Sequence, residues 1–251
     1  MKKILFLIIS VSTALYVNAQ EADSLFQKGN ELYANARYQD AIEIYENLMS
    51  LGYESPELFL NTGNSYYKQN IIARAILNYE KALLLEPNNN DIKYNLELAN
   101  RLVIDKIEVL PVFFIKGWIR SVRNLFSSDI WAIISLSAFA IALIFISIFL
   151  YSRNFGLKKI SFWLGFFIVL LSAISFIFSN QQKQRILSGN TAIVMNPSVT
   201  VKSSPDTSGT DLFVIHEGTK VSIADQISDW KEIKLSDGSK GWLKTEDLEV
   251  I

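Results

Sequence analysis

The chain has 251 residues, with 24 basic and 25 acidic side chains and a formal net charge of −1. It contains no cysteine, which excludes disulfides, thiolate metal sites and a cysteine nucleophile, and its single histidine excludes a His-rich metal centre. The charge is uneven: residues 111–189 carry 8 basic and 1 acidic side chains, whereas residues 21–110 and 190–251 have net charges of −6 and −4. Acidic flanks argue against nucleic acid as a partner, and the basic middle segment suits a lipid surface.

Residues 1–19 have the pattern of a secretory signal peptide. Lys2 and Lys3 precede an apolar run over residues 4–16, and Val17-Asn18-Ala19 offers residues that a signal peptidase accepts. We expect cleavage before Gln20; an uncleaved anchor helix is the alternative. Both interpretations export the segment that follows.

Residues 22–103 contain an internal repeat with a period of 34 residues. A glycine in a predicted first helix lets a second helix approach closely, and an alanine and a tyrosine four residues apart on the second helix fill the space beside it. The matched pairs are Gly29 and Gly63, Asn30 and Asn64, Tyr33 and Tyr67, Ala41 and Ala75, and Tyr45 and Tyr79.

This pattern resembles the tetratricopeptide repeat (TPR). The second copy carries the family's signature residues at Phe59, Gly63, Tyr66, Ala75, Tyr79, Ala82 and Pro87. The first copy departs from the signature at Lys28, Leu48 and Tyr53, and residues 91–102 match only a first helix. The resemblance implies an all-α solenoid over residues 20–105, with two repeats and a capping helix.

In TPR domains the first helices line a groove, and asparagines there hold an extended peptide backbone, since an amide both donates and accepts. The resemblance therefore implies peptide-binding residues at Asn30, Asn61, Asn64, Tyr67 and Asn95. Phe26 occupies the position of a lysine that captures a free C-terminus in one subfamily, so we expect no such capture. The alternative is that these are ordinary exposed asparagines without a ligand.

Residues 106–130 form a junction in which apolar and basic residues alternate at helical spacing. Leu110-Pro111 interrupts the preceding helix, and the apolar residues from Phe113 to Phe126 recur around Lys116, Arg120 and Arg123. The pattern predicts an amphipathic helix in the membrane interface. The alternative is a helix that packs on the repeats.

Residues 131–151 and 160–179 contain no charged residue, and each run has the length that a helix needs to cross a bilayer. We expect a transmembrane hairpin in the bacterial inner membrane; two buried core helices are the alternative. The loop 152–159 carries Arg153, Lys158 and Lys159 and no acid, which places it in the cytoplasm by the positive-inside rule. The linker 180–189 then returns the chain to the periplasm, where both flanking domains should lie.

Residues 190–251 change to short alternating runs separated by Gly, Pro and Asp-Gly, which predicts a small all-β domain. The order of "VKSSP", "EGTKV", Trp230 and the hairpin "LSDGSKGW" resembles the bacterial SH3-like (SH3b) domain, which implies a barrel. Trp230 and Trp242 are the candidate groove residues. The alternative is that both tryptophans pack within the domain.

The sequence shows no catalytic constellation, so we expect neither an enzyme nor a cofactor. His216, in "LFVIHEG", is expected to be a surface or hydrogen-bonding histidine, and a hydrolase that uses it is the weakest alternative. The multidomain order of signal, TPR solenoid, hairpin and SH3-like barrel resembles the BatE family of the bacterial aerotolerance (Bat) operon.

That resemblance implies a membrane scaffold for protein partners, among them von Willebrand-type domain membrane proteins and a MoxR-type ATPase system. It also links the chain to stress or oxygen tolerance. The alternative function is a cell-wall module, in which the SH3b domain binds peptidoglycan peptide while the repeats recruit a wall enzyme.

Overall fold

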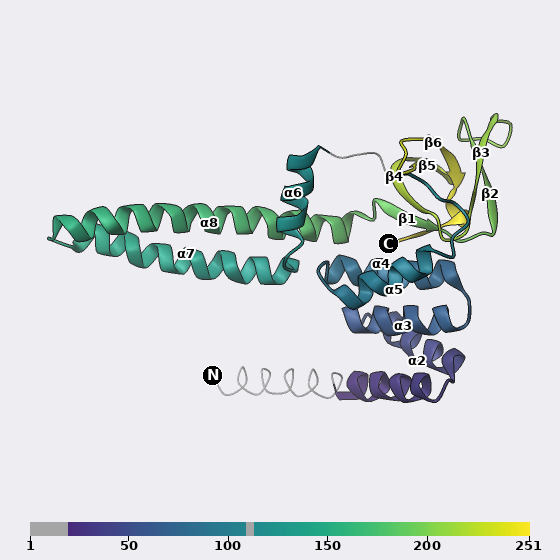
Figure 1. Ribbon diagram of the computed structural model, residues 1–251, viewed down its shortest axis with the longest axis horizontal. Helices are drawn as coiled ribbons and strands as arrows, with labels where there is room; N and C mark the ends of the chain where they lie inside the picture. Colours follow the sequence, from purple (N-terminus) through teal and green to yellow (C-terminus); the bar gives the residue numbers. More distant parts are fainter. Residues whose placement is uncertain (1–19, 109–112) are drawn as a thin grey trace, which may run out of the picture. The chain divides into compact units, whose positions relative to one another are not determined.

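A computed structural model describes residues 20–108 and 113–251, so the expected signal peptide lies outside the described residues. The chain forms two compact units. The first joins the N-terminal helices to the C-terminal strands of Thr191–Ile251, and the second contains the segment Leu110–Asn190 (Figure 1). A helical region, two apolar helices and an antiparallel sheet confirm the multidomain layout.

The N-terminal helices form two antiparallel pairs and one single helix. Residues 20–34 pair with α2 (Tyr38–Ser50), and α3 (Pro56–Lys68) pairs with α4 (Ile72–Leu85). The single helix is α5 (Asn90–Asn100), which lies where the sequence predicts a capping helix. At the start of α3, Ser55 Oγ accepts a hydrogen bond from Leu58 N at 3.1 Å, and Pro56 occupies the first turn, where its missing N–H is harmless.

Two glycines set the distance between the helices of each pair. A Cβ atom on Gly29 would lie 2.5 Å from Tyr45 Cε1, and one on Gly63 would lie 2.7 Å from Tyr79 Cε1. Tyr45 and Tyr79 are almost completely buried. The close approach that the repeat pattern predicts is therefore present in both copies.

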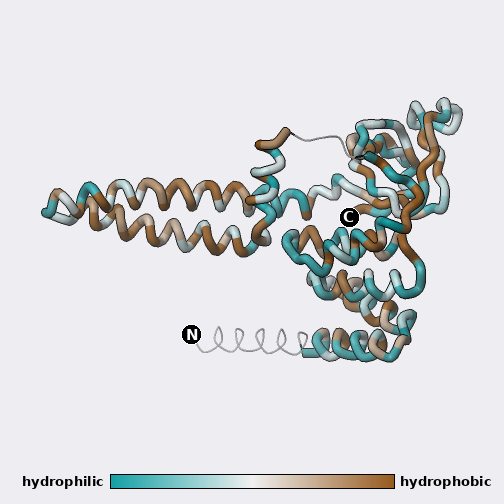
Figure 2. The backbone as a smooth tube through the Cα atoms, in the orientation of Figure 1, coloured by the Kyte–Doolittle hydropathy of each residue, from teal (hydrophilic) through white to brown (hydrophobic). Residues whose placement is uncertain are grey.

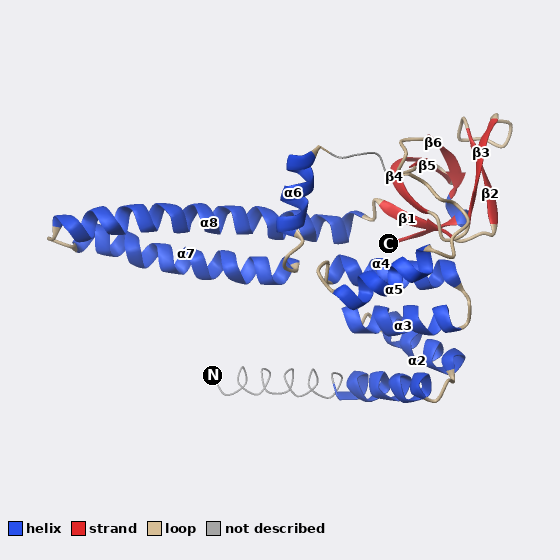
Figure 3. Cartoon of the chain, viewed as in Figure 1, coloured by secondary structure: helices blue, strands red, loops and turns tan. Residues whose placement is uncertain are grey.

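The C-terminal residues form one antiparallel sheet of seven strands, in the order β3-β2-β6-β5-β4-β1-β7. Figure 3 draws the strands of this domain in red. The strands are β1 (Thr191–Val194), β2 (Ser198–Lys202), β3 (Asp211–His216), β4 (Lys220–Ile227), β5 (Trp230–Lys234), β6 (Lys240–Lys244) and β7 (Leu248–Val250), with a short 3₁₀ helix, η1 (Thr245–Asp247), before β7. The sheet is open at β3 and β7, whereas the sequence predicts a closed barrel. The barrel does not close because the terminal strands β3 and β7 do not pair with each other. Inside the sheet, β2 joins β6 through a single register pair, Lys202 with Trp242, beside a bulge at Val201/Lys202.

The β domain buries a continuous apolar core on one face of the sheet. Along β5 and β6, Ile233, Gly241 and Leu243 point inward, and they alternate with outward residues as a pleated strand requires. A Cβ atom on Gly241 would lie 2.4 Å from Val201 Cγ1, so β6 and β2 cross too closely for any side chain there. Ile107, from the end of the helical region, packs against this core.

The second unit contains α6 (Phe114–Arg123), α7 (Ser128–Tyr151) and α8 (Phe155–Ser188). By length and composition, α7 and α8 could each cross a membrane, and they are the two such helices in the described part of the chain. Figure 2 colours most of both helices as hydrophobic.

α8 is longer than the predicted crossing over residues 160–179. It begins at Phe155, inside the predicted loop, because Asn154 Oδ1 caps it by accepting from Gly156 N at 2.8 Å. It continues through the predicted linker to Ser188, since Gln, Lys and Arg favour helices, and Gly189 ends it with a left-handed φ of +53°.

Small residues line the contact between α7 and α8. Ser135, Ala138 and Ala142 on α7 are buried, and so are Gly165 and Ser172 on α8. Ser135 Oγ donates to Ser172 O at 3.0 Å, and Ser172 Oγ donates to Ser135 O at 2.9 Å. These serines form a polar stripe that the sequence analysis did not recognise, and the stripe leaves large apolar side chains on the outer faces of the hairpin.

Candidate functional site

Four of the five predicted groove residues form two equivalent hydrogen-bonded clusters. Asn30 Oδ1 accepts from Asn61 Nδ2 at 2.8 Å and from Tyr45 OH at 2.8 Å. One repeat later, Asn64 Oδ1 accepts from Asn95 Nδ2 at 2.9 Å and from Tyr79 OH at 2.8 Å. Each asparagine oxygen therefore joins a tyrosine of its own repeat to an asparagine of the next repeat.

These contacts give Asn30 and Asn64 a structural role. A carbonyl oxygen accepts about two hydrogen bonds, so the oxygens of both residues are saturated, and a ligand would meet their Nδ2 donors instead. Burial raises the pKa of Tyr45 to about 12, and burial followed by the neighbouring Tyr33 and Tyr67 hydroxyls raises the pKa of Tyr79. Both tyrosines therefore remain hydrogen-bond donors at physiological pH.

The fifth predicted residue, Tyr67, is half-buried beside the second cluster. Its counterpart Tyr33 approaches both Tyr45 and Tyr79, although the sequence analysis did not select it as a site residue. The 34-residue period already pairs Tyr33 with Tyr67, so the repeat pattern alone could have identified Tyr33 as a groove residue. The candidate groove thus consists of the predicted residues together with Tyr33.

The Asn64→Ala variant is expected to lose about 1–3 kcal/mol of stability, because it leaves the buried Tyr79 hydroxyl without its acceptor. Asn47→Ala, at an exposed position of α2, is the matched control and should change stability little. Thermal unfolding of the purified full chain, followed by circular dichroism in neutral detergent, makes the comparison. Equal melting temperatures for the two variants would contradict the structural role.

The two predicted groove residues of the β domain lie on the outer face of the sheet. Trp242 is paired with Glu232, and Trp230 is paired with Lys244, so the two tryptophans occupy diagonal positions on the same face of adjacent strands. Both are half-buried, and the neighbouring Ile227 side chain is exposed. The structure therefore brings both tryptophans together on one partly apolar surface.

A second set of contacts joins the helical region to the β domain through Asp105. Its Oδ2 accepts from the backbone N of His216 at 2.7 Å and from Thr219 Oγ1 at 2.6 Å, while Oδ1 lies 2.8 Å from His216 Nδ1. Burial opposes the ionisation of Asp105, but the hydrogen bonds from Thr219 and His216 outweigh it and hold the pKa of this carboxyl below its ordinary value. Asp105 is therefore an ionised acceptor for three donors.

Packing and ion pairs surround this carboxylate. A Cβ atom on Gly218 would lie 2.9 Å from Val103 Cγ2, so the β3–β4 turn is pressed against the end of the helical region. Lys220 Nζ lies 2.6 Å from Glu80 Oε2 on α4. The attachment of the β domain therefore uses α4 and residues 103–107.

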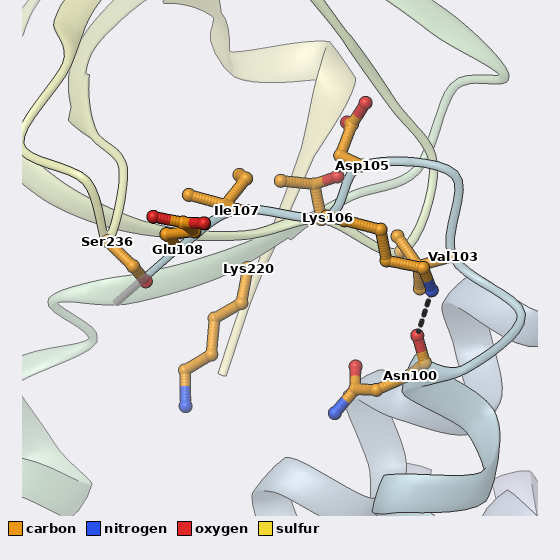
Figure 4. A pocket seen from close by; sticks show the side chains of 10 residues that line it. Asn100, Val103, Asp105, Lys106, Ile107, Glu108, Lys220 and Ser236 are labelled. Carbon is orange, nitrogen blue, oxygen red and sulfur yellow. Dashed lines mark hydrogen bonds between the residues drawn. The ribbon is translucent and has the colours of Figure 1, made fainter. Parts of the chain in front are cut away.

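An open cavity of about 420 Å³ lies beside the attachment (Figure 4). Its walls come from residues 100–108 and from the β domain, with charged side chains of both signs. Lys106 Nζ is occupied by the carbonyls of Asn100 and Arg101, at 3.2 and 3.0 Å. The cavity is therefore lined by side chains of both charges, and its lining does not direct several unpaired polar groups at one point where a ligand could bind.

His216 is a hydrogen-bonding histidine, one of the two roles expected from the sequence. Sequence reasoning missed Asp105 as its partner, since the two residues are 111 positions apart and no periodic pattern connects them. The contacts of Thr219 with Asp105 and of Lys220 with Glu80 also join distant parts of the sequence, and sequence reasoning missed them for the same reason.

Comparison with known proteins identifies one repeat. Residues 56–89, which contain α3 and α4, match the family model described as the tetratricopeptide repeat. No curated protein matches the chain. The repeat supports protein–protein interaction as the role of the helical region.

Proposed function

We propose that the chain is a non-enzymatic, membrane-anchored scaffold that presents its repeat groove and its β domain to protein partners in the bacterial periplasm. One observation carries this proposal: the segments before and after the apolar hairpin pack into one compact unit. The hydrogen bonds between Asp105 and His216 are part of that packing.

The contact between the two segments constrains the topology. Two segments that touch must lie on the same side of a membrane, and a hairpin of two crossings returns the chain to the side from which it came. The exposed apolar side chains of α7 and α8, such as Leu136 and Phe139, suit a lipid environment. The signal-peptide pattern of residues 1–19 favours the periplasm as the common side.

One unit offers two surfaces for a ligand. The groove has amide donors and the tyrosine rings of Tyr33 and Tyr67, and the β domain has the face of Trp230 and Trp242. Because both surfaces belong to one unit, a partner that binds one of them meets the other at high effective concentration. We take the β domain to be an SH3-like module whose sheet is open between β3 and β7.

The order of modules resembles the BatE family, and this resemblance suggests which partners to test. We propose von Willebrand-type domain membrane proteins and a MoxR-type ATPase system as components of the same complex, with a role in stress or oxygen tolerance. The observed modules support binding rather than redox chemistry, since a chain without cysteine has no thiol to exchange.

Site-specific photocrosslinking in cells tests the scaffold. A photoreactive residue at Tyr67 is expected to give a defined adduct with a protein of the von Willebrand type. The same residue at Glu43, on the exposed side of α2, should give none. Adducts of equal yield at the two positions, or no adduct at Tyr67, would contradict a partner in the groove.

A further inference from the structure

The turn that follows α6 is held firmly against α8. Gln182 Nε2 donates to Arg123 O at 2.5 Å and to Phe126 O at 2.8 Å, and Trp131 Nε1 also donates to Arg123 O at 2.8 Å. Gln182 and Trp131 are both buried. These bonds fix α6 across α8 (Figure 1) and bring the basic residues of two separate segments together.

Arginines converge at this turn without acidic partners. Arg120 and Arg123 lie one turn apart on α6, and Arg185 comes from the end of α8. Burial lowers the pKa of Arg123, and the positive charges of Arg185 and Arg120 lower it further. In residues 113–188 as the structure describes them, none of the three arginines forms an ion pair. A bound anion would therefore offset the repulsion among the three positive charges.

Unpaired polar atoms gather at the same place. Within the described residues, five buried side-chain atoms lack a hydrogen-bond partner, and three of them belong to this turn and its contact: Arg123 Nε, Asn124 Oδ1 and Gln182 Oε1. Gln182 is only 3% exposed. A donor and two acceptors that remain unpaired fit a ligand with anionic oxygens and hydroxyl groups.

The other face of α6 is apolar and exposed. Phe114 and Trp118 have 73% and 70% of their surface accessible, and they lie opposite the stripe of Lys116, Arg120 and Arg123. Aromatic rings beside cations are typical of helices that lie at the boundary between headgroups and acyl chains. The ligand of the arginines is therefore expected to sit at that boundary.

Topology alone does not account for these cations. The proposed periplasmic end of the hairpin has five basic residues at positions 116, 120, 123, 183 and 185, whereas the short cytoplasmic loop has three. The positive-inside rule favours the opposite distribution. The excess on the exported side needs another reason, and phosphate binding supplies one.

We propose that Arg120, Arg123 and Arg185 bind the phosphate of an anionic phospholipid, with Asn124 and Gln182 able to accept from hydroxyl groups of its head. The inference rests on the proposed membrane anchoring. Guanidinium groups suit the task because their planar fork pairs with two phosphate oxygens. A bound phosphoglycerol headgroup would neutralise the arginine cluster.

The test uses the full chain in phosphatidylcholine vesicles that contain phosphatidylglycerol as the minor lipid. Flotation reports insertion, and native mass spectrometry after extraction into neutral detergent counts the phosphatidylglycerol that stays bound. The wild-type chain is expected to retain it. Arg120→Gln/Arg123→Gln/Arg185→Gln should weaken retention roughly 100-fold, at about fivefold for each cation removed.

Two variants control for charge and for folding. Arg153→Gln/Lys158→Gln/Lys159→Gln removes the same charge at the other end of the hairpin and should retain the lipid as the wild type does. Arg120→Lys/Arg123→Lys/Arg185→Lys keeps the charge but not the fork, and should retain the lipid at an intermediate level.

The outcomes separate this inference from the anchoring on which it rests. A chain that does not float with vesicles would overturn both. A chain that floats but retains phosphatidylglycerol no better than the arginine-to-glutamine variant would overturn the lipid site alone. Displacement of the lipid by inorganic phosphate at equal concentration would also overturn it, because the site would then belong to a free anion.

Discussion

Replacing Asp105 with alanine is expected to detach the β domain from the helical region. The carboxylate accepts three hydrogen bonds of 2.6–2.8 Å from His216 and Thr219, and its side chain is only 15% exposed. Removal of one ionised partner from such a network leaves its donors unpaired and weakens the attachment by about 3 kcal/mol. Faster hydrogen exchange at the His216 amide, followed by mass spectrometry, would report the loss.

The matched control for this variant is Asp206→Ala. Asp206 is exposed and accepts hydrogen bonds only within its own loop, from Ser204 and Ser208. Its removal should leave exchange at His216 unchanged. If Asp105→Ala and Asp206→Ala behave alike, Asp105 does not hold the two segments together.

The same contact predicts a pH dependence. The pKa of Asp105 is lower in the folded chain than in the unfolded one, so its contribution is fully present above the ordinary range of aspartate and is lost as the pH falls through the depressed folded value. Acid should therefore release the β domain in the wild-type chain. An Asp105→Asn variant should lack this acid-dependent step.

The Gly63→Ala variant is expected to disrupt the second repeat. The new methyl group would lie 2.7 Å from Tyr79 Cε1 and 3.2 Å from the backbone oxygen of Ala75, and Tyr79 is almost completely buried. Neither neighbour can move freely, so the overpacking should destabilise the chain by about 1–3 kcal/mol. The measurement is the melting temperature of the helical signal in the full chain.

Gly117→Ala is the opposite case. Gly117 lies within α6 with no atom within 4 Å of an added Cβ, so alanine should stabilise that helix by about 0.5–1 kcal/mol. A Gly63→Ala variant that melts at the wild-type temperature would mean that the two helices of the repeat are not in close contact.

The parts of the fold that depend on local pattern could be predicted from the sequence. The spacing of Gly63, Ala75 and Tyr79 predicts a helix pair because all three residues act within 34 positions, and the apolar runs predict long helices because composition alone decides them. The clusters around Asn30 and Asn64 could also be predicted, since the repeat places a tyrosine 15 residues after each asparagine.

Features that depend on contacts between distant segments could not be predicted. The residues next to Asp105 in the sequence do not indicate its role. Its partners His216 and Thr219 follow it in the sequence only after the two long helices α7 and α8. The open sheet depends on whether β3 and β7 pair with each other, and the alternating pattern of each strand does not determine which strands become neighbours. The arginine cluster depends on contacts such as the bond from Gln182 to Arg123 O, which join α6 to α8 across 59 positions.

The most direct test of the central claim is a cross-link between the segments before and after the hairpin. Because the chain has no cysteine, Glu80→Cys/Lys220→Cys introduces only the two residues whose charged atoms lie 2.6 Å apart. In membranes from expressing cells, a short bifunctional maleimide should link them within one chain, and adding Asp105→Ala should lower the yield. Full labelling of both cysteines without a link would contradict a single unit on one side of the membrane.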